Sequence, residues 1–207
     1  MAEAVELPIV DLASSDRNAS ACSIRKACTE CGFFYLINHG VEESLLQKVL
    51  EGNKMFFSLC LEEKMKLARK NHRGYTPLYA EKLDTSTSSR EVLPGWRSIM
   101  EGYYEQVMNA GKRLVKLVAL ALSLDESFFY DLGAFNPPDG YLRLLHYPGE
   151  LGSSDEEIYG ASAHSDYGMI TLLATDGIHG LQEYLTCSFN LAALAFCVVV
   201  DANVLTS

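Results

Sequence analysis

The residues best suited to chemistry in this sequence are His164 and Asp166, which are separated by a single residue. In an extended chain, residues i and i+2 point to the same face, so the imidazole and the carboxylate could bind one metal ion. A second histidine from elsewhere would complete a two-histidine, one-carboxylate triad, which leaves positions open on Fe(II) for a co-substrate and O2. The same spacing also arises by chance, and the alternative interpretation is an ordinary surface loop.

Three stretches of sequence accompany this pair. They are residues 7–11 with 32–35 and 38–40, then residues 143–148, and finally residues 160–168 with 170–173 and 180–182. The last stretch reads H-x-D-x-G, followed by a short apolar run and by Gly-Leu-Gln. Together they resemble the plant-type iron(II)/2-oxoglutarate-dependent dioxygenases, the family of isopenicillin N synthase, over about residues 5–182.

The resemblance implies a role for each matched position. His164 and Asp166 would be two of the three iron ligands, and the hydroxyl of Tyr147 would help to hold 2-oxoglutarate. The implied fold is α+β, with an N-terminal helical region and a C-terminal double-stranded β-helix (a jelly roll), incomplete at its C-terminal end. The implied activity is hydroxylation or desaturation of a small organic substrate of plant secondary metabolism, with Fe(II), 2-oxoglutarate and O2.

The sequence departs from this family where the site should be completed. The family takes its third ligand from a histidine far beyond the H-x-D pair, whereas the one later histidine here is His179, beside a turn at Asp176 and Gly177. A residue at a hairpin tip should point away from the site. The family also anchors 2-oxoglutarate with a later arginine, and no arginine follows Arg143. We therefore expect weakened co-substrate binding and impaired activity.

Two other functions stay open on the sequence. One is a non-catalytic truncated isoform, or a pseudoenzyme that binds a partner through an exposed strand edge or its N-terminal helices. The other is a zinc hydrolase, which would use His164, Asp166 and His179 and would need no 2-oxoglutarate. A third metal ligand within the folded protein would distinguish the dioxygenase from the non-catalytic chain.

Two further features depart from the family pattern. Residues 183–207 do not resemble it, and a stretch that lines the substrate entrance in relatives is missing between Ser89 and Arg90. The apolar run at residues 191–200 lacks the expected strand pattern. These features predict a chain shortened by alternative splicing or by an error in gene prediction. A shortened jelly roll would expose sheet edges, which the apolar tail would patch or which would promote association.

Apolar periodicity and turn residues predict the elements of the chain. Strands are expected at residues 7–11, 33–37, 141–147 and 170–174, and turns at 38–40, 136–140 and 176–177. Helices are expected at residues 19–31, 45–57, 62–69 and 99–122. The resulting division is an N-terminal region at 1–135, a partial jelly roll at 136–182 and a divergent tail at 183–207.

Other candidate ligands have simpler structural explanations. His39 lies in a turn and is expected to hydrogen-bond to backbone. His146 alternates with Tyr147 along an expected strand, so the two should face opposite ways. Cys28 and Cys31 share a helical face with apolar residues and are expected in the core, although their spacing also fits a redox or zinc pair.

Composition limits the partners of the protein. The chain of 207 residues has 17 Lys and Arg against 27 Asp and Glu, a net charge of −10, which excludes a general affinity for nucleic acid or anionic membranes. No basic cluster opens the chain, and the longest apolar run, at residues 191–200, is shorter than the about 18 residues of a membrane span. We therefore expect a cytoplasmic protein with free thiols that acts on a small molecule.

Overall fold

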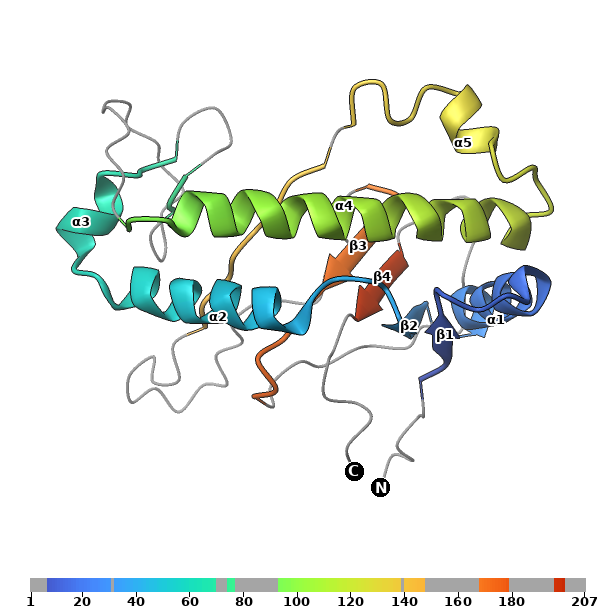
Figure 1. The fold of residues 1–207 in the computed structure, drawn as a ribbon, viewed down its shortest axis with the longest axis horizontal. Coiled ribbons are helices and arrows are strands. Elements are labelled where there is room, and N and C mark those ends of the chain that lie inside the picture. The colour runs from blue at the N-terminus through green and yellow to red at the C-terminus, as the bar shows by residue number, and fades with distance from the viewer. Residues whose placement is uncertain are drawn as a thin grey trace, which may run out of the picture.

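The computed structural model describes residues 7–30, 32–69, 74–76, 93–138, 140–147 and 168–178, and the backbone of 196–199 (Figure 1). The elements in chain order are β1 (Ile9–Asp11), α1 (Arg17–Glu30), β2 (Phe33–Ile37), α2 (Glu43–Ser58), α3 (Leu61–Met65), α4 (Trp96–Ala121), α5 (Phe128–Asp131), β3 (Ile170–Leu173) and β4 (Phe196–Val199). The expected mixture of helix and sheet is confirmed, and α3 is shorter than the helix expected at 62–69.

The first two strands and the helix between them form as the sequence predicts. Helix α1 ends at Glu30, and Gly32 just beyond it adopts a φ of 80° and donates its N–H to the carbonyl of Ala27 at 2.8 Å. After β2, the chain turns through Asn38 at φ 52° and Gly40 at φ 80°. Positive φ values are strained for most residues and accessible to glycine and asparagine, which explains why these types occur here.

The strands form one four-stranded sheet in the order β1-β2-β4-β3, and all neighbours run parallel. Val10 pairs with Leu36, and Val198 of β4 pairs with Phe34 on one side and Leu172 on the other. Strand β4 comes from the tail at 183–207, for which no strand was expected, so that expectation is wrong. The tail strand occupies the interior of the sheet and does more than patch an edge.

The stretch at residues 141–147 is irregular in the structure, so the strand expected there is wrong. A strand needs a neighbour to share its hydrogen bonds. Within the described sheet, β3 pairs with β4, and β4 pairs with β2 on its other side.

The described strands are parallel, whereas a jelly roll is built from antiparallel strands. Most of the region predicted as a jelly roll, at 148–167 and beyond 178, lies outside the described residues.

Helix α4, with 26 residues, is the long helix of the fold and packs along both α1 and α2 (Figure 1). Its C-terminal half buries Leu114, Leu117 and Val118 against α1 and the first two strands. Its N-terminal half buries Tyr103 against α2 in a second, smaller cluster. Because such side chains recur on one face at helical spacing, the sequence predicts the length of this helix well.

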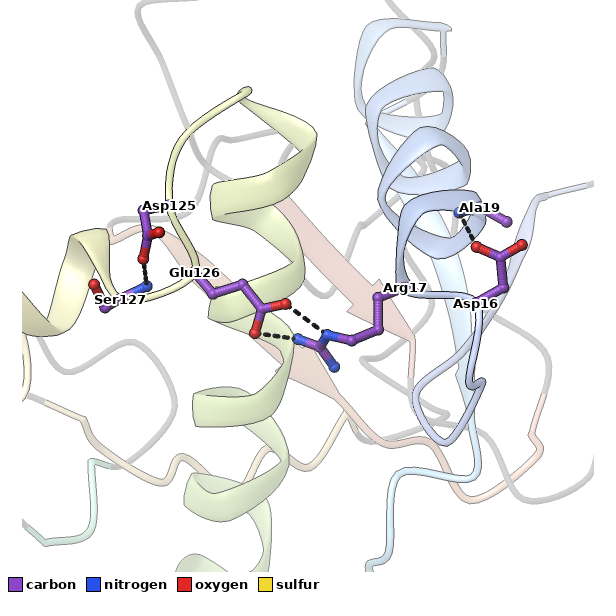
Figure 2. Close-up of polar contacts among 6 residues, drawn as sticks. All are labelled: Asp16, Arg17, Ala19, Asp125, Glu126 and Ser127. Carbon is purple, nitrogen blue, oxygen red and sulfur yellow. Dashed lines mark hydrogen bonds and ion pairs between the residues drawn. The ribbon is translucent and has the colours of Figure 1, made fainter.

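Two polar side chains at the start of α1, Asp16 and Arg17, make hydrogen bonds that stabilise this end of the helix. Figure 2 shows Arg17, at the start of α1, reaching Glu126 in the loop after α4 through two hydrogen bonds of 2.7 and 2.9 Å. In the same view, the carboxylate of Asp16 accepts the N–H of Ala19 at 2.9 Å and so caps the first turn of α1. The Arg17–Glu126 pair therefore ties α1 to the loop after α4, whereas the Asp16 contact stabilises the first turn of α1 itself.

Candidate metal and co-substrate site

Tyr147 is the one predicted site residue that lies among the described residues. It belongs to the irregular stretch described at residues 140–147, and 54% of its surface is exposed. The structure thus holds the backbone before Tyr147 against the helices but leaves the Tyr147 side chain exposed.

The segment 140–147 is attached to the helices by side chains. The hydroxyl of Tyr104 on α4 donates to the carbonyl of Gly140 at 2.9 Å. Leu144 packs into the small cluster that contains Tyr103. The two attachments fix the beginning and middle of the segment against the α2–α4 pair.

His146 completes the attachment. Its ring stacks on Phe57 of α2, with centroids 5.1 Å apart and planes 23° from parallel. The strand argument that set His146 and Tyr147 on opposite faces does not apply, because the segment is not a strand. A packing contact with α2 places His146 instead.

The predicted iron ligands His164 and Asp166 lie outside the described residues, as does His179. The described chain resumes at Gly168, whose φ is 100°, and enters β3 at Ile170. Strand β3 packs on α4, where the side chain of Leu172 approaches Gly111. In sequence, the H-x-D motif ends four residues before a strand that packs against the core.

The donor types of the motif fit iron. An imidazole and a carboxylate are two of the three protein donors of non-haem Fe(II) sites that keep coordination positions open. Among the residues that the structure describes, no group of three His, Cys, Asp or Glu side chains could hold a metal ion. The turn expected beside His179 is confirmed, with Gly177 at φ 77° and the neighbouring Ile178 73% exposed.

His39 is a structural turn residue, as predicted. Its Nδ1 accepts the backbone N–H of Val41 at 3.1 Å, and its carbonyl accepts a hydrogen bond of 3.2 Å from the guanidinium of Arg113. Burial, and secondarily the positive charge of Arg113, lowers the pKa of His39 below its usual 6.5. Arg113 also donates to the carbonyl of Leu12 at 3.1 Å, so it links α4 to the chain just after each of the two N-terminal strands.

The cysteine prediction is confirmed for one residue of the pair. Cys28 is half-buried and packs against the large core cluster. Cys31 lies outside the described residues, so the redox or zinc alternative stays untested.

Sequence reasoning missed the side chains that hold the segment before Tyr147. Phe57 has the pattern of an ordinary apolar position of α2, and Tyr104 that of an ordinary aromatic of α4. Phe57 contacts His146, and Tyr104 donates a hydrogen bond to Gly140. These partners lie far along the chain, and no local spacing predicts such contacts. They become visible only when the helices pack.

Residues 7–113, just over half of the chain, match the family described as non-haem dioxygenase in morphine synthesis, N-terminal. The azadirone synthase LFS of Melia azedarach is 33% identical over 212 residues, which cover 85% of this chain and 63% of that protein. The kihadalactone A synthase LFS of Citrus sinensis is 34% identical with the same coverage. The chain belongs to the non-haem iron(II)/2-oxoglutarate-dependent dioxygenase family, as the sequence motifs predicted.

A solved structure supports the fold. A full-length Neurospora crassa protein, in complex with alpha-KG, superposes with a TM-score of 0.53 at 18% identity, over 64% of this chain and 53% of that chain. The predicted cofactors, Fe(II) and 2-oxoglutarate, are those of the family's 2-oxoglutarate-Fe(II) members. The chain spans 63% of the length of the curated relatives named above. None of the helices in the described ranges is long and apolar enough to cross a membrane.

Proposed function

We propose that the protein is an Fe(II)/2-oxoglutarate-dependent oxidoreductase that hydroxylates or desaturates a small organic molecule. The observation that carries this proposal is the pair His164 and Asp166, shortly before strand β3, in a chain of the dioxygenase family. The named relatives are synthases of azadirone and of kihadalactone A. A plant specialised metabolite is therefore the substrate class we propose, and a jelly roll is the proposed setting of the site.

Each proposed site residue has a separate task. His164 supplies a neutral imidazole and Asp166 a carboxylate to the iron, while Tyr147 donates its hydroxyl to 2-oxoglutarate. When bound there, iron and 2-oxoglutarate would supply the oxidising chemistry that uses O2. The chain's own contribution is to orient the two small molecules and to exclude water from them.

For these 207 residues we propose reduced activity. After Asp166 the sequence offers one histidine, His179, and after Arg143 it offers no Lys or Arg to pair with the distal carboxylate of 2-oxoglutarate. A carboxylate that is taken out of water without a partner binds weakly, because its desolvation is not compensated.

Anaerobic titration calorimetry tests the proposal. Fe(II) should bind at micromolar affinity to the unaltered chain, 2-oxoglutarate should tighten it, and His164→Ala and Asp166→Asn should abolish binding. His72→Ala is the matched control, because that histidine lies in a polar stretch of sequence about 90 residues before the motif and should leave the affinity unchanged. Equal iron binding by all four proteins would refute the assignment of the ligands.

A second candidate is a non-catalytic protein that acts through a partner. The observation that favours it is strand β4, by which a tail unlike the family enters the middle of the sheet. Absence of iron binding by the folded, unaltered chain would favour this candidate over the oxidoreductase.

A further inference from the structure

The backbone that carries Tyr147 is held in place by packing and not by a strand ladder. Gly140 is fixed by a hydrogen bond, Leu144 by packing, partly buried, against the small cluster, and His146 by its ring contact with Phe57. The last of these contacts is adjacent to Tyr147 in sequence. It is therefore the contact that most directly determines where the next side chain starts.

We propose that the ring contact between His146 and Phe57 positions the hydroxyl of Tyr147 for the co-substrate. Phe57 and His146 are then positioning residues, and helix α2 controls co-substrate affinity through them. The inference rests on the proposed function, in which Tyr147 binds 2-oxoglutarate.

The geometry supports a contact that resists rotation. The two rings lie 5.1 Å apart and are close to parallel, which is the offset-stacked arrangement that aromatic pairs favour. Tyr147 itself is more than half exposed, so burial does not fix its direction. An exposed side chain on an unanchored backbone loses more conformational freedom when it binds a ligand, and that loss lowers affinity. Anchoring the preceding residue removes part of that cost.

The position of Tyr147 can be measured without any co-substrate. The chain has 11 tyrosines, so 3-fluorotyrosine labelling gives a small set of fluorine NMR signals, and Tyr147→Phe identifies the signal of Tyr147 by its loss. His146→Ala and Phe57→Leu should shift and narrow this signal. His146→Phe, which keeps a ring on Phe57, should restore it. Met55→Ala, at a 56% exposed position of the same helix, should leave it unchanged.

Co-substrate affinity gives the second measurement. In anaerobic calorimetry with Fe(II), His146→Ala should weaken 2-oxoglutarate binding about three- to tenfold, the equivalent of one aromatic pair. His146→Phe should retain the affinity. In combination with Tyr147→Phe, His146→Ala should add little, because residues that act through one another are not additive. A general loosening of the fold would instead give additive losses.

The outcomes separate the inference from the proposed function. A Tyr147 signal that is unchanged in His146→Ala and Phe57→Leu overturns the inference, whether or not 2-oxoglutarate binds. Additive affinity losses overturn it as well. If the signal moves as expected but the unaltered chain binds no 2-oxoglutarate, the positioning contact is supported and the proposed function fails.

Discussion

The guanidinium of Arg17 forms a two-point ion pair with the carboxylate of Glu126, with Nε 2.7 Å from Oε1 and Nη2 2.9 Å from Oε2 (Figure 2). The pair joins the first turn of α1 to the loop after α4, across 109 residues of sequence. Both side chains are 40% exposed, so solvent screens the attraction. Its planar, two-point geometry is one that arginine provides and lysine does not.

Arg17→Lys should lower the free energy of unfolding by about 0.5–1 kcal/mol, a range that already allows for screening. Urea denaturation at low and high salt measures it, and the difference should shrink as salt rises. The pair of Arg97 and Glu101, with side chains 82% and 60% exposed, is the matched control. Arg97→Lys should lower the free energy of unfolding by less. An equal loss in both variants would show that the long-range pair stabilises the fold no more than this exposed pair does.

A close approach of α2 and α4 makes Gly52 sensitive to substitution. A Cβ on Gly52 would lie 2.8 Å from two ring atoms of Trp96, whereas a Cβ on Gly102 of α4 would meet nothing within 4 Å. Gly52→Ala should therefore destabilise the protein by about 1–3 kcal/mol through overpacking. Gly102→Ala should stabilise it by up to about 1 kcal/mol, because alanine is the better helix former.

Thermal and urea denaturation compare these two variants directly. Trp96 is the only tryptophan of the chain, so its fluorescence also reports the displacement of the ring in Gly52→Ala. A stabilising Gly52→Ala would show that α2 and α4 are further apart than this contact implies.

The neutral state of His39 should make stability depend on pH. Burial, with help from Arg113, holds the pKa of His39 below 6.5 in the folded chain, so the unfolded chain binds more protons as the pH falls. The contribution of neutral His39 to the free energy of unfolding is therefore fully present above about pH 6.5. It is lost as the pH falls through the pKa of His39 in the folded chain. Protonation would also remove the acceptor that Nδ1 offers to the N–H of Val41.

His39→Asn is the matched variant for this prediction, because an amide oxygen can accept the same N–H and does not titrate. Urea denaturation from about pH 7.5 to about pH 5.5, a range that spans the usual histidine pKa, should show a steeper loss of stability for the unaltered chain than for His39→Asn. Parallel curves would show that other groups cause the pH dependence.

Because β4 lies between two other strands of the sheet, the loss of one of its backbone N–H donors should destabilise the fold. Val198 pairs with both Phe34 and Leu172, so Val198→Pro would remove a donor and should cost about 1–3 kcal/mol. Val198→Thr keeps the backbone donor and a β-branched side chain, and should cost less than Val198→Pro. Hydrogen exchange checks the same point, since the amides of β4 should exchange slowly. Equal stability of the two variants would contradict a paired tail strand.

Local pattern predicted most of the helical part. The strand Phe33–Ile37 was predicted with its observed bounds, and α4 begins and ends within three residues of the expected limits. Both have a clear period of apolar residues, ended by glycine or by a turn. Such elements form where local preference and packing agree.

The two wrong strand predictions share one cause. Residues 141–147 have the composition of a strand but lie on the α2–α4 pair, and the tail lacks a clear pattern but supplies β4. A strand is defined by its neighbour, and the neighbour is chosen by the packing of the entire chain. One sequence segment on its own does not contain that information.

The sequence by itself determined the family, the helical region and the residue types that suit iron, because H-x-D and its flanking residues are local patterns of chemical groups. The tertiary structure decided which residues hold the segment that carries Tyr147. Phe57 reaches His146 from far along the sequence, since α2 and the segment after α5 come together only in the folded chain. Contacts between distant residues depend on how whole elements pack, and that is a property of the fold rather than of any one stretch of sequence.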